Sequence, residues 1–119
     1  MKRALIVLGL VLTTAIGGLP SQVQAASAAI TPSYQVRSHG QTASWALTWG
    51  GGAPYSVNFA YGDGGFWSPA SSYSTSATVY RTWWPCSSTN YYQSLYVNDA
   101  HGNFASAGST TVVTGGSPC

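Results

Sequence analysis

Two alternating segments joined by a turn occupy residues 43–61, whose sequence is ASWALTWGGGAPYSVNFAY. In each segment large apolar residues alternate with small or polar ones. Side chains two apart share one face of a strand, so the pattern predicts two strands, each with one buried and one wet face. The glycines and proline of residues 50–54 break the chain between them and allow a reversal. The expected core residues are Trp45, Leu47, Trp49, Tyr55, Val57, Phe59 and Tyr61.

Glycine, proline, serine and asparagine interrupt the chain after residue 33 every eight to twelve residues, and no stretch keeps a helical apolar period. Tyrosine, tryptophan, valine and threonine dominate the segments between these turns, which is typical of strands. We expect a loop at 66–73 and six or seven strands in all. The fold class is therefore all-β, an immunoglobulin-like antiparallel β-sandwich, with a small barrel as the alternative. The further strands are expected at 34–37, 75–84, 91–99 and 104–114.

The N-terminus carries the three parts of an export signal. Lys2 and Arg3 precede an apolar run over 4–12, and small residues end at Ala25. The run is shorter than the roughly 20 residues that a membrane-spanning helix needs, so a cleaved signal peptide is favoured over an anchor. We expect a signal peptide over 1–25, a flexible leader over 26–33 and the sandwich domain over 34–119.

Removal of the signal leaves 119 − 25 = 94 residues. Two arginines and two aspartates remain, so the formal net charge is 2 − 2 = 0. Four ionised side chains cannot form a basic footprint, which argues against nucleic acid as a partner. We expect a secreted, extracellular protein without membrane insertion after cleavage, and the absence of net repulsion permits self-association.

Cys86 and Cys119 are the only cysteines of the sequence. In an exported chain the pair predicts a disulfide. Two free thiols, or a bridge to another chain through the terminal Cys119, are the alternatives.

Two motifs resemble the PKD (polycystic kidney disease) domain family: FAYGDG at residues 59–64 and YYQSLYVNDAHGN at residues 91–103. They cover about a quarter of the mature chain and occur in the family's order. Ala60 departs from the usual aspartate, and the intervening stretch, with an insertion around 66–90, is longer than usual. The resemblance implies a seven-stranded sandwich from extracellular adhesion or polysaccharide-active proteins. It also implies structural turn roles for Gly62, Asp63, Gly64, Asp99 and Gly102.

The only carboxylates, Asp63 and Asp99, offer the pair that a polysaccharide hydrolase needs. Both stand beside glycines, where aspartate commonly caps a turn, so we expect no catalytic residue. His39 and His101 with Asp99 have the right chemistry for a transition metal. Their spacing is unspecific, and we expect surface turn residues, no metal and no cofactor.

Aromatic side chains give the strongest functional indication. Neighbouring side chains of a strand point to opposite sides, so Trp83 and Trp84 cannot both be buried. In the 91–99 strand, Tyr92 and Tyr96 share the wet face about 13 Å apart. Either this face binds a ligand, or residues 66–84 cover it as a second small core. The expected binding residues are Trp67, Trp83, Trp84, Tyr92 and Tyr96.

These patterns predict a non-enzymatic binding or adhesion module whose ligand is an extracellular protein or a polysaccharide. A self-associating structural subunit is the first alternative, since sheet edges can pair between chains. A secreted inhibitor and a polysaccharide hydrolase are the remaining ones.

Overall fold

The computed structural model describes residues 25–119. The predicted signal peptide, apart from its last residue, lies outside the described residues. Within them the chain forms eight strands and no helix. The described residues therefore contain no helix that is long and apolar enough to cross a membrane. The strands are β1 (Ser27–Thr31), β2 (Tyr34–Arg37), β3 (Thr42–Gly50), β4 (Ser56–Ala60), β5 (Phe66–Trp67), β6 (Ser76–Thr82), β7 (Thr89–Asn98) and β8 (Phe104–Val113).

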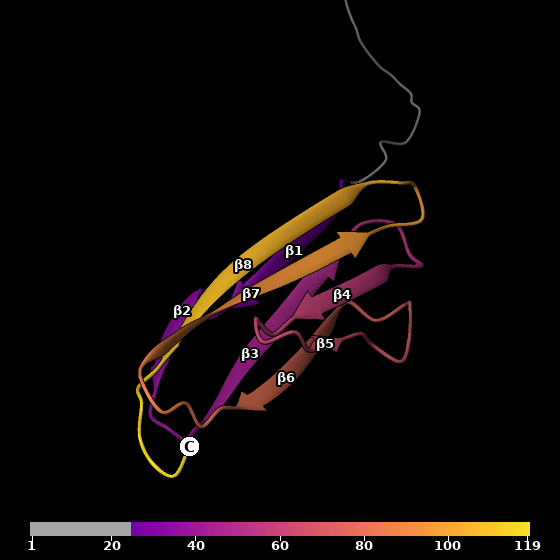
Figure 1. Ribbon diagram of the computed structural model, residues 1–119. Coiled ribbons are helices and arrows are strands. Elements are labelled where there is room, and N and C mark those ends of the chain that lie inside the picture. The colour runs from indigo at the N-terminus through magenta and orange to yellow at the C-terminus, as the bar shows by residue number, and fades with distance from the viewer. Residues whose placement is uncertain (1–24) are drawn as a thin grey trace, which may run out of the picture.

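Two sheets pack face to face (Figure 1). One has three strands in the order β1-β3-β6, and the other has five in the order β2-β8-β7-β4-β5. Most neighbours are antiparallel, while β2 pairs with β8 in parallel. Consecutive strands that change sheet are the mark of an immunoglobulin-like sandwich, which confirms the predicted fold class.

The two alternating segments become β3 and β4, and their apolar sides build the centre of the core. Trp45 and Leu47 of β3 and Phe59 of β4 are fully buried. The Trp45 ring lies against Phe59, Tyr61 and Trp83, with ring centroids 5.7, 6.0 and 5.9 Å away. The turn over 50–54 carries the chain from one sheet to the other, so β3 and β4 face each other across the core rather than pairing.

The segment expected as a flexible leader forms a strand. Residues 27–31 pair with β3 over its last five residues as β1. A cis peptide at Thr31–Pro32 follows, and the chain then enters the other sheet as β2. The sandwich therefore begins at residue 27 rather than at residue 34, because residues 27–31 pair with β3 and Ile30 is buried in the core.

The structure shows which side of the expected 75–84 strand is buried. Trp45 of β3 pairs with Val79 of β6, so Val79 faces the core. Trp83 follows on the same side and is 7% exposed, whereas Tyr80 and Trp84 face solvent. The alternating pattern alone could not show which side of the strand is buried, because both sides carry large apolar residues.

Residues 66–90 do not cover the wet face of β7. Phe66 and Trp67, expected within a loop, form β5 at the edge of β4. Residues 76–82 join the opposite sheet as β6. Tyr92 and Tyr96 remain 62% and 44% exposed, which excludes a second small core over them.

The predicted disulfide joins Cys86 to Cys119 at one end of the sandwich. It ties the C-terminal tail to the segment that leads into β7, and the amide of Gly116 donates to the carbonyl of Pro85 beside it. The hairpin between β7 and β8 lies at the opposite end (Figure 1), where Ala100 donates to Gly52.

Candidate functional site

The solvent side of the five-stranded sheet gathers most of the exposed aromatic rings, and we call it the aromatic face. The pairing registers define its members, because directly opposed residues share a side of a sheet. Its aromatic residues are Tyr34 of β2, Phe66 of β5, Tyr92 and Tyr96 of β7, and Phe104 of β8. The residues between and beside them are Val36, Ser56, Asn58, Ala60, Ser94, Asn98, Ser106, Gly108, Thr110 and Val112.

The rings form two groups on this face. Tyr96 and Phe104 stack on each other, with centroids 6.3 Å apart and planes at 26°. The second group consists of Tyr92 and Tyr34, which flank Thr110; Thr110 pairs with both. The two tyrosines of β7 are four residues apart and therefore separated by about 13 Å. That spacing matches a ligand longer than a single ring.

Small residues separate the two groups. Ala60 pairs with Ser94, and Ser94 pairs with Gly108, so one row across three strands carries no large side chain. Phe66 closes this row at β5, opposite Ala60. An extended ligand that crosses the strands along this row would have aromatic rings on both sides and backbone close beneath it.

No charged side chain belongs to the aromatic face. Arg81 and Asp63 pair with each other elsewhere, and Asp99 is buried in a turn. Arg37 of β2 follows Val36, so its side chain leaves on the other side of the strand. The face therefore offers hydroxyl, carboxamide and ring groups to a ligand, but no ionic contact.

Only two of the five predicted binding residues lie on this face, Tyr92 and Tyr96. Trp83 is buried in the core and stacks on Tyr91 at 4.0 Å, which corrects the expectation that its ring meets a ligand. Trp67 opposes Phe59 and packs partly buried against the core. Trp84 is exposed, but it lies over Gly40 in the turn between β2 and β3.

Sequence reasoning missed Tyr34, Phe66 and Phe104. The alternation of Tyr34, Gln35 and Val36 gave a signal that points the wrong way, because the polar Gln35 is the buried member of that strand. Gln35 donates to the carbonyl of Ser44 across the core. Phe66 and Phe104 had no such signal, since their side depends on which residues they pair with.

Asp63 of the first PKD-like motif connects the two sheets. Its Oδ1 accepts from the Gly65 amide at 2.8 Å, as a turn cap does. Its Oδ2 accepts from Nε of Arg81 and from Nε1 of the buried Trp83, both at 2.8 Å. Desolvation alone would raise the pKa of Asp63, but the hydrogen bonds from Trp83, Gly65 and Arg81 hold it below its ordinary value. The carboxylate is thus engaged in holding β6 against the 62–65 turn.

Asp63→Asn is expected to lower the free energy of unfolding by about 1–3 kcal/mol at pH 7, because the amide has only one acceptor oxygen. Its NH2 group would face either the Gly65 amide or the Arg81 and Trp83 donors, and the ion pair with Arg81 would be lost. Since the folded pKa lies below the unfolded one, the carboxylate stabilises the fold above the unfolded pKa. That stabilisation is lost as pH falls through the folded pKa. Urea unfolding of both proteins at pH 7 and pH 3 should show the difference shrinking at pH 3. An equal difference at both pH values would contradict this role.

Asp99 of the second motif holds the opposite end of the sandwich. Its oxygens accept from the amides of Gly52, His101 and Asn103 at 3.1, 2.9 and 2.8 Å. Burial alone would raise the pKa of Asp99, but these hydrogen bonds lower it to about 2. The carboxylate thereby joins the β7–β8 hairpin to the turn after β3.

The candidate catalytic and metal sets are not brought together. Asp63 and Asp99 accept hydrogen bonds from separate sets of residues, as described above. His39 lies beside Gly116, whereas His101 lies beside Gly52 at the other end. Within residues 25–119 no three histidine, cysteine or acidic side chains gather into a metal-binding group.

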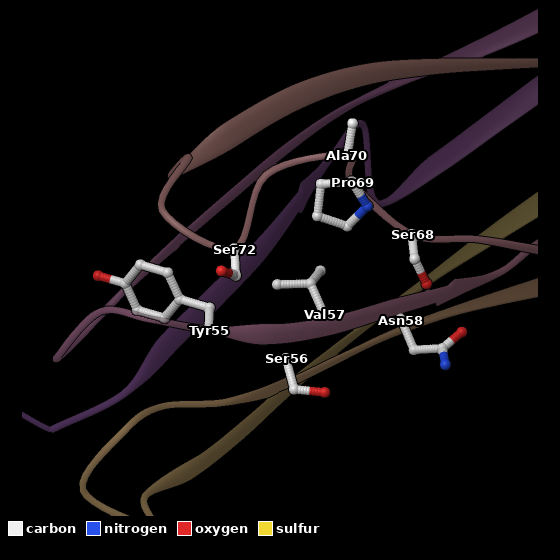
Figure 2. A pocket seen from close by; sticks show the side chains of 8 residues that line it. All are labelled: Tyr55, Ser56, Val57, Asn58, Ser68, Pro69, Ala70 and Ser72. Carbon is white, nitrogen blue, oxygen red and sulfur yellow. The ribbon is translucent and has the colours of Figure 1, made fainter.

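A pocket of about 330 Å³ opens beside β4 (Figure 2). It adjoins the aromatic face, because Asn58 belongs to both. The loop that follows β5 forms one wall and β4 the other. The lining residues are Tyr55, Ser56, Val57, Asn58, Ser68, Pro69, Ala70 and Ser72.

By its strand order the domain belongs to the class of immunoglobulin-like β-sandwiches. Two solved structures with the same architecture are similar to it. It is similar to the PKD domain of an M14-like peptidase from Thermoplasmatales archaeon SCGC AB-540-F20, with a TM-score of 0.57 and 16% identity over 79% of this chain and 98% of that one. It is also similar to the N-terminal four Ig domains of Dscam1 isoform 8.4, with a TM-score of 0.55 and 14% identity over 86% of this chain and 22% of that one.

No family model matches the chain, and no curated protein matches its sequence. By fold, the chain is a divergent PKD/Ig-like domain, which confirms the resemblance at that level. At these identities the similarity describes the fold and leaves function to the site.

Proposed function

We propose that the mature chain is a secreted, non-enzymatic binding module that holds a neutral polysaccharide on its aromatic face. The observation that carries this proposal is the set of five exposed aromatic rings on one uncharged side of the five-stranded sheet. Exposed apolar surface of this kind is costly to leave in water and marks a binding surface. The N-terminal signal pattern and the disulfide support export.

A polysaccharide fits the chemistry of the face better than a charged ligand does. Sugar rings present a flat C–H side that packs on an aromatic ring and an edge of hydroxyls that hydrogen-bonds. Ser94, Asn58 and Ser106 stand next to the rings and supply donors and acceptors. A nucleic acid or an acidic polymer would leave its charges without partners, because the face carries no arginine or lysine.

The test is co-sedimentation of residues 26–119 with insoluble polymers: cellulose, chitin and bacterial cell wall. Tyr92→Ala/Tyr96→Ala is expected to weaken binding at least tenfold, because two rings lose stacking contacts of about 0.5–1.5 kcal/mol each, together with apolar burial. Tyr80→Ala is the matched control. Tyr80 is as exposed as Tyr92, at 62%, but lies on the other sheet.

Three outcomes would contradict the proposal: no polymer bound, equal loss in the Tyr80 control, or unchanged binding in the double variant. Light scattering over a range of concentrations tests the other occupant of the face, a second copy of the chain. Association that the Tyr92 and Tyr96 substitutions abolish, without polymer binding, would assign the face to self-association.

A further inference from the structure

The pocket beside β4 exists because the pairing of β5 stops early. Phe59 pairs with Trp67, so two residues further along Val57 would face Pro69. Proline has no amide hydrogen and cannot continue the ladder. The chain bulges away over 69–71 and returns at Ser72, whose carbonyl accepts from the amide of Tyr55 at 2.6 Å. An opening therefore remains between two closed positions of the same sheet edge.

Backbone groups of Val57 face this opening. The amide of Tyr61 donates to Gly65 and that of Tyr55 to Ser72, so alternate residues of β4 direct their N–H and C=O groups toward the β5 side. Val57 lies between them in the same phase. Within residues 25–119 no backbone hydrogen bond reaches Val57 from that side. The pocket thus holds one donor and one acceptor from the main chain, in fixed positions.

Several side chains around the opening are polar, and none is charged. Ser68 and Ser72 bring hydroxyls from the loop, and Asn58 brings a carboxamide from the strand. Figure 2 shows Pro69 and Ala70 across the opening from Val57, with Ser68 and Asn58 at one end. Serine and asparagine both donate and accept, which is the combination that a sugar hydroxyl requires.

The pocket continues the aromatic face. Asn58 pairs directly with Tyr96, so its side chain belongs both to the face and to the rim of the pocket. A chain lying over Tyr96 and directed toward β4 would reach Asn58 next and the opening after it.

We infer that this pocket is a subsite for one neutral pyranose ring, at the end or at a branch of the polysaccharide bound on the aromatic face. The inference rests on the proposed function. A volume near 330 Å³ is at the small end of ligand pockets, which span about 300–1,000 Å³, and suits a single ring. Main-chain and hydroxyl partners without any charge select an uncharged sugar.

The test titrates the isotope-labelled mature protein with methyl glucoside, methyl galactoside, methyl mannoside and N-acetylglucosamine while the backbone amide signals are recorded by NMR. At least one sugar should shift the signals of Val57 and Ser72, with a dissociation constant on the order of millimolar for so small a ligand. Asn58→Ala is expected to weaken this binding about fivefold, as the loss of one neutral hydrogen bond does.

Two further variants separate the pocket from the face. Ala70→Trp fills the opening from the loop without removing a polar partner, and it should abolish the shifts while binding through Tyr92 and Tyr96 persists. Tyr80→Ala is the control, because Tyr80 is exposed on the other sheet, away from both the pocket and the aromatic face. It should leave the shifts unchanged.

Each combination of results has a distinct meaning. Polymer binding without shifts for any of the four sugars, or shifts that survive Ala70→Trp, would overturn the subsite and leave the proposed function standing. Shifts without polymer binding would support the pocket and overturn the role of the face. The absence of both would overturn both.

Discussion

Gly62→Ala is expected to destabilise the domain by about 3 kcal/mol or more, a large fraction of the about 5–15 kcal/mol that usually stabilises a domain. Gly62 has a φ of +94°, which alanine adopts only under strain. A Cβ there would also lie 2.5 Å from the carbonyl oxygen and 2.7 Å from the nitrogen of Tyr92. Both atoms are backbone within a central strand and cannot move aside. Urea unfolding of the two proteins measures the difference.

Gly64→Ala provides the matched control two residues away. Gly64 has nearly the same φ, +92°, but an added Cβ would meet nothing within 4 Å. This variant should lose only the backbone strain, about 1–2 kcal/mol. Equal losses at the two positions would show that contact with Tyr92 contributes nothing, and a stable Gly62→Ala protein would contradict the argument altogether.

Cys86→Ala/Cys119→Ala is expected to lower the free energy of unfolding by about 3–4 kcal/mol. The bridge closes a loop of 33 residues, and its main effect is to restrict the unfolded chain. The small size of the domain makes the loss large relative to the total, because chains of this length bury only about two-thirds of their unfolded surface. Thermal unfolding of the variant and the parent, each with and without a reducing agent, measures it.

Reductant should bring the parent to the stability of the double variant and leave the variant unchanged. A loss of stability below about 1 kcal/mol would mean that the disulfide adds little constraint to the unfolded chain. The aromatic face is on the strands, away from the tail, so polysaccharide binding by the folded fraction of the variant should match that of the parent.

Strand positions and the fold class could be predicted from the sequence because they depend on local pattern. The alternation over residues 43–49 and 55–61 identified β3 and β4 and their buried sides. The apolar side of a strand is buried whichever element packs against it. The disulfide could be predicted because only two cysteines were present to form it. Tyr92 and Tyr96 could be assigned to the wet side, because Leu95 and Val97 fix the inward side of β7.

The rest of the candidate site depends on partners that are distant in sequence. Phe66, Phe104 and Tyr34 join Tyr92 and Tyr96 only because β5, β8 and β2 enter the same sheet in a particular register. Trp83 was assigned to a ligand although it is in the core, because nothing local shows that Asp63 accepts its indole N–H.

By itself, the sequence determined the all-β class, the alternation of β3, β4 and β7, and the cysteine pair, because each follows from neighbours within a few residues. Only the tertiary structure decided that the leader pairs as β1, that residues 76–82 leave the aromatic face uncovered, and that Pro69 opens a pocket beside Val57. The physical reason is that sheet pairing links segments up to tens of residues apart, and the side on which a side chain meets its neighbours is fixed only when the strands pair.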